Sequence, residues 1–223
     1  MSYNNGPKIV TNGLVMYLDA ANNRSYPGSG TSWNDLSGNG NGMGIETGTT
    51  FSNANGGNFI LNGTNVRLAA GATNSIKSTV NFVTISSWFK FNALPSAEVA
   101  IIDRGDSWRL GFVPGAARCL VKTVGGTDGW TAANDFVYSF LTNTWYHITM
   151  TYNGSNMRIY LNSELVKTAT VTGTINTNNN FTFMGFVSTS MNGNLATCLV
   201  YNTPQSAAEV LQNYHASKGR FGL

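Results

Sequence analysis

The carboxylates of this chain are few and scattered. Only 10 of its 223 residues are Asp or Glu. Hydrolysis of a glycoside needs two carboxyl groups roughly 5–9.5 Å apart across the bound sugar, and along one strand alternate residues share a face. Asp103 and Asp106 lack that spacing, and the glutamates stand singly at Glu46, Glu98, Glu164 and Glu209. The sequence therefore predicts no catalytic residues and no enzyme. The alternative, a polysaccharide depolymerase or glycosidase, would need distant carboxylates brought together by folding.

Nucleophilic and metal chemistry also lack a pattern. No Gly-x-Ser-x-Gly elbow occurs, and the two histidines are His147, inside an expected strand, and His215, at the end of an expected helix. Cys119 and Cys198, taken together with these histidines, do not show the sequence spacing that is typical of zinc ligands. We expect both cysteines to be buried free thiols, with a disulfide between them as the alternative.

One segment has the composition of a sugar-binding loop. Residues 125–135 are rich in glycine and polar residues and contain Trp130, flanked by Asp128 and Asn134. An aromatic platform beside amide and carboxylate groups is typical of a saccharide site. These three residues, together with Trp33 in a second polar segment, are our candidate ligand-binding residues. The alternative is that each tryptophan folds back and packs over the edge of the protein.

The elements that would position these residues are mostly strands. Runs with a period of two are bounded by turn residues, at residues 13–18, 58–61, 83–91, 100–103, 108–113, 118–123, 145–152, 157–161, 166–172, 181–186 and 195–201. In the run 145–152 one face is apolar and the other more polar, which predicts a half-buried strand. No linker divides the chain, so residues 1–223 are predicted to form a single domain.

One helix is expected, over residues 206–217. Ser206 and Glu209 form a capping box. The apolar stripe that follows consists of Ala207, Val210, Leu211 and Tyr214, and Gly219 is the expected residue just past the helix end. The sequence thus predicts an all-β, antiparallel two-sheet sandwich with one short C-terminal helix.

Charge and hydropathy exclude several partners. The formal net charge is only +3, with 13 Lys and Arg residues spread singly along the chain. No basic run follows a phosphate backbone, so we expect no nucleic acid partner. No apolar stretch is long enough to span a membrane, and the N-terminus lacks the pattern of a secretory signal peptide.

Several segments together resemble the laminin-G-like jelly roll, a branch of the concanavalin A-like lectin/glucanase superfamily. They are residues 83–91 (VTISSWFKF), 145–154 (WYHITMTYNG), 157–165 (MRIYLNSEL) and the closing stretch 191–209. The resemblance implies a jelly-roll sandwich and a lectin-like binding role. It also implies that His147 belongs to the packing of its strand. Glucanases of this superfamily carry a Glu-x-Asp-x-Glu pattern, which is absent here.

A narrower resemblance concerns the ends of the chain. Residues 7–20, 25–41 and 218–223 resemble virion-associated proteins of large tailed bacteriophages. This implies a non-enzymatic structural protein of the virion (capsid decoration, fibre or tail), made in the host cytoplasm. Its partners would be other virion proteins and host-surface polysaccharide, and it would form a homo-oligomer, a trimer by preference, or repeat on the particle lattice. Phe221 and Leu223 would dock on a neighbouring subunit, or alternatively tuck under the helix. A free carbohydrate-binding domain is the other alternative.

The same family resemblance raises the question of calcium. Laminin-G-like domains often carry one ion, which needs hard oxygen ligands. Asp19, Asp35, Asn39 and Asn41 could supply them. Asp35 could instead cap its own turn, and the family's acidic positions after Gly193 hold neutral residues here. We therefore expect no cofactor, with calcium at these four residues as the alternative.

Overall fold

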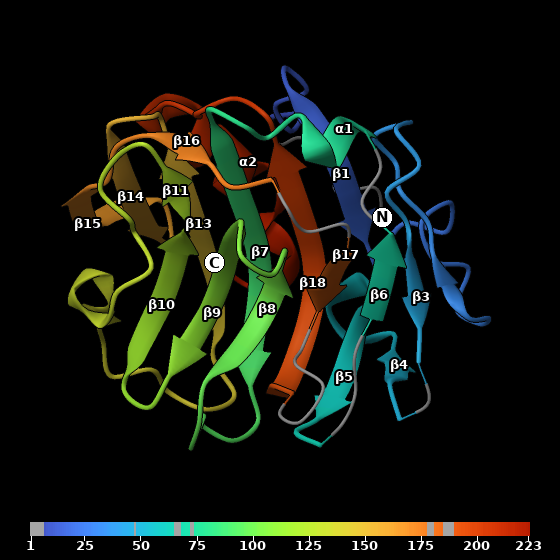
Figure 1. Cartoon of the computed structure of the whole chain (residues 1–223). Helices are drawn as coiled ribbons and strands as arrows, with labels where there is room; N and C mark the ends of the chain where they lie inside the picture. The colour runs from blue at the N-terminus through green and yellow to red at the C-terminus, as the bar shows by residue number, and fades with distance from the viewer. Residues whose placement is uncertain (1–6, 47, 65–67, 72–73, 178–180, 185–189) are drawn as a thin grey trace.

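Two antiparallel sheets packed face to face make up most of the molecule (Figure 1). The computed structural model describes residues 7–46, 48–64, 68–71, 74–177, 181–184 and 190–223. The first sheet runs in the order β15 (Glu164–Thr170), β14 (Asn156–Leu161), β13 (Trp145–Tyr152), β7 (Val83–Phe91), β18 (Asn192–Tyr201), β5 (Asn58–Asn62) and β4 (Thr50–Ser52), and β1 (Leu14–Asp19) also pairs with β18.

The second sheet faces the viewer in Figure 1. Its order is β12 (Phe136–Val137), β10 (Ala116–Val121), β9 (Trp108–Val113), β8 (Val99–Asp103), β17 (Phe181–Met184), β6 (Leu68–Gly71), β3 (Met43–Ile45) and β2 (Ser32–Trp33). A small ribbon pairs β11 (Thr123–Val124) with β16 (Thr174–Ile175). The helices are α1 (Asn74–Lys77), α2 (Ala207–Ser217) and the 3-10 turns η1 (Ala54–Gly56), η2 (Ala132–Asn134) and η3 (Lys218–Phe221).

The core lies between the two sheets, where alternate residues of each strand meet. Ile85 and Phe89 of β7 face Leu110 and Phe112 of β9, and each is at most 1% exposed. Period-two alternation places every second side chain on the inner face, which is why the long strands could be predicted. The expected bounds of β7, β9 and β13 agree with the structure. The predicted all-β sandwich with a short C-terminal helix is confirmed.

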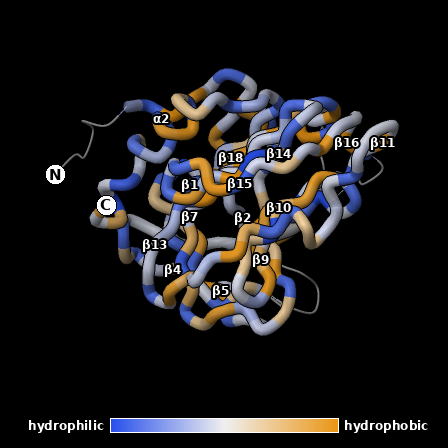
Figure 2. Tube along the Cα trace, turned by 90° about the vertical axis from the view of Figure 1, so that its left-hand side faces the viewer, coloured by the Kyte–Doolittle hydropathy of each residue, from blue (hydrophilic) through white to orange (hydrophobic). Residues whose placement is uncertain are grey.

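The outer face of the first sheet is also covered. Helix α2 lies on the side of β1 and β7 away from β9 and β10 (Figure 2), where Tyr214 stacks on Trp88 with ring centroids 5.5 Å apart. All eight residues of β13 are buried, including His147 at 2% exposure. The prediction of a half-buried strand was therefore wrong, because the period-two pattern does not reveal a helix that returns from the far end of the chain.

Helix α2 begins as predicted and ends differently. The Ser206 hydroxyl accepts the N–H of Glu209, and the Glu209 carboxylate accepts the N–H of Ser206, which confirms the capping box. Gly219 does not end the helix. The chain continues through η3, and Gly222, at φ 75°, takes the left-handed conformation. Leu211 is 43% exposed rather than part of the buried stripe.

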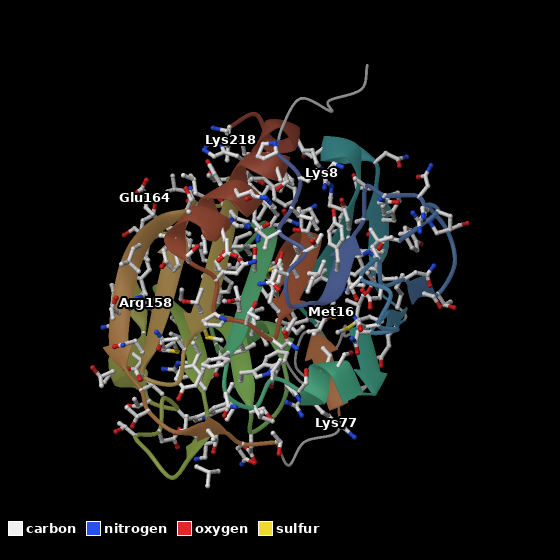
Figure 3. The ribbon with its side chains drawn as sticks, turned by 90° about the horizontal axis from the view of Figure 1, so that it is seen from above. Lys8, Met16, Lys77, Arg158, Glu164 and Lys218 are labelled. Atoms are coloured by element: carbon white, nitrogen blue, oxygen red, sulfur yellow. The ribbon has the colours of Figure 1, made fainter. Side chains whose placement is uncertain are left out.

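Polar side chains tie α2 to the N-terminal segment, and Lys8 lies on the α2 side of the molecule in Figure 3. Buried Asn213 accepts the Val10 N–H at 2.8 Å and donates to the Tyr201 hydroxyl at 3.1 Å. Gln212 donates to the Lys8 carbonyl at 2.7 Å. These bonds explain why a buried asparagine is tolerated in a helix face.

The two cysteines agree with the expected free thiols. Cys119 and Cys198 are both buried and unpaired. Burial raises the pKa of both thiols well above the ordinary value. Of the helices in the described ranges, none has the length and apolar character needed to cross a bilayer.

Candidate functional site

The predicted sugar-binding loop lies beside the outer face of the second sheet. Trp130 is only partly buried, and the Arg109 guanidinium of β9 lies 4.7 Å from its ring centroid. The loop is held close because the Gly129 N–H donates to the Val121 carbonyl of β10 at 3.0 Å. Trp130 therefore lies against an arginine and remains a partly exposed residue.

Asp128 and Asn134 stabilise the shape of this loop. Asp128 accepts the Trp130 N–H at 2.9 Å and pairs with Lys122 at 2.8 Å. Asn134 donates to the Gly129 carbonyl at 3.2 Å. Partial burial acts to raise the pKa of Asp128, but the hydrogen bonds from Lys122 and the Trp130 N–H outweigh it, so the pKa is lowered. The structure thus brings together all three loop residues that the sequence indicated.

Next to Trp130 lies a network of five charged side chains that sequence reasoning missed. Arg109 contacts Glu98 at 2.5 Å and Asp103 at 2.8 Å. Arg118 contacts Glu98 at 3.0 Å and Asp135 at 2.7 Å. Glu98 thus bridges the two arginines, although it stands singly in the sequence.

The β9–β10 hairpin explains why the arginines converge. Arg109 pairs with Leu120, and Arg118 pairs with Gly111, so both arginines project from the outer face at neighbouring positions. Each strand shows this only as one arginine in an apolar run. The hairpin register, once known, is the signal that would have found the pair.

The environment of Asp103 shows that the network is partly desolvated. Burial raises the pKa of the Asp103 carboxyl, against the opposing effect of Arg109 beside it. Hydrogen bonding to Asp135 is the largest cause that raises the pKa of Arg118. Each of the three carboxylates contacts an arginine, and Arg109 in turn lies against the Trp130 ring.

Trp33 does not belong to this site. It is 0% exposed, and its ring packs edge-on against Phe59 at 4.7 Å between centroids. The prediction that Trp33 faces a ligand was wrong. The polar residues around Trp33 in the sequence suggested a surface loop, whereas β2 pairs with β3 and turns the indole inward.

The four candidate calcium ligands make hydrogen bonds within the protein. Asp35 accepts the N–H groups of Tyr17, Ser37 and Asn41 at 2.8–2.9 Å, as an Asx turn requires. Asp19 pairs with Arg220 at 2.8 Å and accepts the Ala21 N–H at 3.0 Å.

The amides of this group are engaged in the same way. Asn39 donates to the Leu14 carbonyl and Asn41 to the Val15 carbonyl. Within the described part of the chain, no group of three or more His, Cys, Asp or Glu could hold a metal ion. The hydrogen bonds that Asp19 and Asp35 accept come from N–H and O–H groups of the protein.

His147 and the nearby Ser86 form a buried pair beneath α2. The Ser86 hydroxyl lies 2.7 Å from His147 Nε2. Burial lowers the pKa of His147 to about 3, so the imidazole is neutral at physiological pH and a poor base. Among the described residues nothing pairs with Nδ1, so no carboxylate orients the ring as a catalytic triad requires. Both side chains are buried, Ser86 at 0% and His147 at 2% exposure.

Of the two alternatives for the C-terminal residues, packing within the chain is the one that the structure shows for Phe221. Its ring stacks on Trp88 at 4.2 Å and lies 4.6 Å from Trp145, leaving Phe221 9% exposed. The side chain is already covered within the chain. Leu223 stays 49% exposed.

These two facing antiparallel sheets define a β-sandwich. The profile of the Concanavalin A-like lectin/glucanases superfamily, of laminin-G type, matches residues 61–211. The chain belongs to this superfamily. Comparison with curated protein sequences finds no match.

Solved structures share the fold at low sequence identity. The binding domain of Paraclostridial Mosquitocidal Protein 1 superposes with a TM-score of 0.71 at 19% identity, over 92% of this chain and 52% of that one. The binding domain of Botulinum Neurotoxin DC in complex with SialylT gives 0.71 at 16%, over 92% and 51%. A mutant of Trypanosoma rangeli sialidase displaying trans-sialidase activity gives 0.71 at 14%, over 98% and 35%. The chain spans about half the length of the two toxin domains, and these similarities describe the fold alone.

Proposed function

We propose that the protein is a non-enzymatic glycan-binding module that uses the Trp130 face of its second sheet. The observation that carries this proposal is the partly exposed indole of Trp130, seated on Arg109 at 4.7 Å and surrounded by the polar loop of Asp128 and Asn134. Sugars bind well to an aromatic ring whose position is fixed before binding, because little conformational entropy is then lost.

Two further points support binding without catalysis. Glu98, Asp103 and Asp135 are each paired with an arginine, and a glycosidase needs one carboxyl group that can give up its proton to the leaving group. The toxin structures of the same fold are described as binding domains, one of them in complex with SialylT.

The binding role can be tested with purified Trp130→Ala protein. Immobilised bacterial capsular and cell-wall polysaccharides serve as probes, and we expect the substitution to weaken binding by about ten-fold, the effect of a single aromatic anchor. Phe82→Ala is the matched control, because Phe82 is an aromatic side chain 39% exposed that precedes β7 and is not part of this loop. Equal binding by both variants would exclude the Trp130 face as the site.

The absence of catalysis needs its own measurement. Incubation with the same polysaccharides should release no reducing ends. A release that disappears on changing Glu98, Asp103 or Asp135 to its amide would instead assign glycosidase activity to the charged network.

We also propose that this module works as a component of a phage particle. The support is the resemblance of residues 7–20, 25–41 and 218–223 to virion-associated proteins of tailed bacteriophages. A single sugar site binds weakly, so a trimer or a repeated lattice position would add avidity. Mass spectrometry of purified virions should find this chain in many copies. Its absence from clean particles would favour a free carbohydrate-binding domain.

A further inference from the structure

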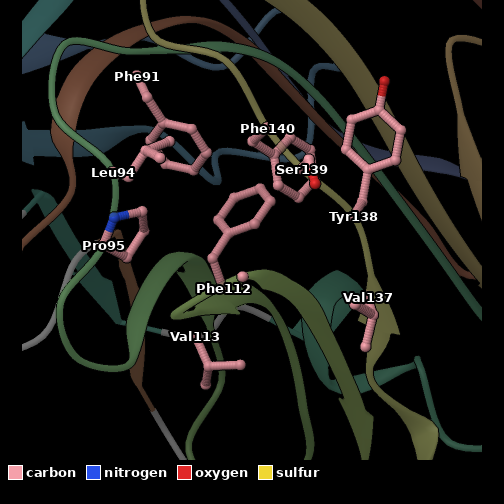
Figure 4. Close-up of a pocket in the computed structure, with 10 residues that line it drawn as sticks. Phe91, Leu94, Pro95, Phe112, Val113, Val137, Tyr138, Ser139 and Phe140 are labelled. Atoms are coloured by element: carbon pink, nitrogen blue, oxygen red, sulfur yellow. The ribbon is translucent and has the colours of Figure 1, made fainter.

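An apolar pocket of about 380 Å³ is lined by β7, β9, the connection after β7 and the segment 137–140 (Figure 4). Its inner part is formed by Phe91, Phe112 and Phe140, whose rings lie edge to face at centroid distances of 4.9, 5.3 and 5.8 Å. These rings come from β7, β9 and the segment after β12. Such contacts hold the rings in place, so the pocket is formed before any ligand arrives.

The rim of this pocket is apolar and exposed. Leu94, Val137 and Tyr138 line it and are 52%, 81% and 37% exposed. Large apolar side chains gathered around a concave site are typical of a binding surface. An apolar group that enters the pocket would remove their surface from water, and this is favourable.

A second pocket, of about 280 Å³, adjoins the first and shares the wall formed by Leu94 and Pro95. Its polar lining consists of amides and hydroxyls, at Asn62, Thr64, Ser96, Ser190 and Asn192. Ser190 is 4% exposed, and among the described residues its hydroxyl oxygen has no hydrogen-bond partner. A buried hydroxyl without a partner costs free energy that a bound polar ligand would recover.

We propose that the two pockets together bind a neutral sugar that carries an apolar substituent, with the sugar in the second pocket and the substituent among the three phenylalanines. Among the described residues that line the pockets, none carries a charge, which favours a neutral ligand over a phosphorylated headgroup. Amide and hydroxyl side chains both donate and accept hydrogen bonds, as sugar hydroxyls do. This site is separate from the Trp130 face and does not rest on the function proposed for it.

Calorimetric titration with methyl, phenyl and octyl β-glucosides, the last kept below its micelle concentration, tests the proposal. We expect the phenyl or octyl compound to bind about ten-fold more tightly than the methyl compound, since only the former reach the aromatic pocket. Tighter binding of the phenyl glucoside would indicate that the pocket prefers an aromatic substituent, and tighter binding of the octyl glucoside that it prefers an alkyl chain. Equal affinity for all three glucosides, or saturable binding of none, would overturn the proposal.

Two variants locate the binding. Leu94→Gln should weaken binding of the better glucoside by about ten-fold, and Leu165→Gln should not, although Leu94 and Leu165 are both 52% exposed. Ser190→Ala should also weaken it, without loss of an internal hydrogen bond. Unchanged affinity in Leu94→Gln would contradict the site. Because Trp130→Ala keeps both pockets, its glucoside binding should match the wild type, so failure here and failure of the Trp130 face are distinguishable.

Discussion

Arg109 holds the candidate binding face together. Its guanidinium contacts Glu98, Asp103 and the Trp130 ring at once. The planar group can pair with carboxylates along its edge while its face lies on an aromatic ring, and a lysine could not do both. The position of Trp130 therefore depends on an ionic network that includes Asp103 of β8, Arg109 of β9 and Arg118 of β10.

At the same scale, His147 makes stability depend on pH. Its pKa falls from 6.5 to about 3 in the folded protein because of burial, so the unfolded chain binds more protons between these values. The contribution of the neutral His147 side chain to the free energy of unfolding is complete above pH 6.5. It is lost as the pH falls toward 3, at up to about 1.4 kcal/mol per pH unit. We expect His147→Gln to flatten this slope in urea titrations at several pH values. A slope in His147→Gln equal to that of the wild type would contradict the assignment.

Asp19 and Asp35 lead to a prediction about metal. The oxygens of Asp35 and Asp19 accept hydrogen bonds from backbone N–H groups, and Asp19 also pairs with Arg220. We therefore expect the melting temperature to change by less than about 2 °C between saturating calcium and EDTA. A ligand at 100 times its Kd would stabilise by about 2.7 kcal/mol and shift it by several degrees. A drop in EDTA that calcium alone reverses would show that the Asp19–Asp35 loop binds the ion.

At the scale of elements, α2 and η3 cover part of the outer face of the first sheet. Trp88 donates to the Ser217 hydroxyl at 2.7 Å and stacks on Phe221. Arg220 extends the attachment to Asp19 at 2.8 Å and to the Gly57 carbonyl at 3.1 Å. The last residues of the chain therefore complete the fold of this sheet.

This packing predicts that the end of the chain is needed for stability. Phe221→Ala should lower the free energy of unfolding by about 3 kcal/mol, because it removes a ring packed on two tryptophans. Leu223→Ala, two residues later and half exposed, should change it by less than about 0.5 kcal/mol. Chemical denaturation of the two variants measures this difference. A similar small effect in both would mean that η3 does not hold the helix in place.

The length of an element decided whether the sequence could predict it. The long strands β7, β9 and β13 repeat their pattern often enough to be found. Strands such as β2 and β12 have two residues each, too few for a period, so the burial of Trp33 was missed. The Trp130 loop was found because a tryptophan in a glycine-rich segment is conspicuous, whereas its ionic support depends on the register between β8, β9 and β10.

For the whole molecule, membership of the superfamily is established by sequence, whereas the role of the surface is proposed. Membership of the lectin-like superfamily fixes the sandwich but not the site, since one fold hosts many functions. Here the Trp130 face lies on the second sheet, whereas the apolar pocket is lined by residues of both sheets, and each has its own variants. The central claim is that glycan meets the molecule at Trp130.

The most direct test follows the five tryptophans by nuclear magnetic resonance. In protein labelled with ¹⁵N at tryptophan, each indole N–H gives one signal, and a Trp130→Phe variant identifies that of Trp130. Trp33, Trp88, Trp108 and Trp145 are at most 9% exposed. On titration with fragments of a bound polysaccharide, we expect the Trp130 signal to shift to saturation while those of the four buried tryptophans stay in place. Saturable binding that leaves the Trp130 signal unmoved would contradict the account.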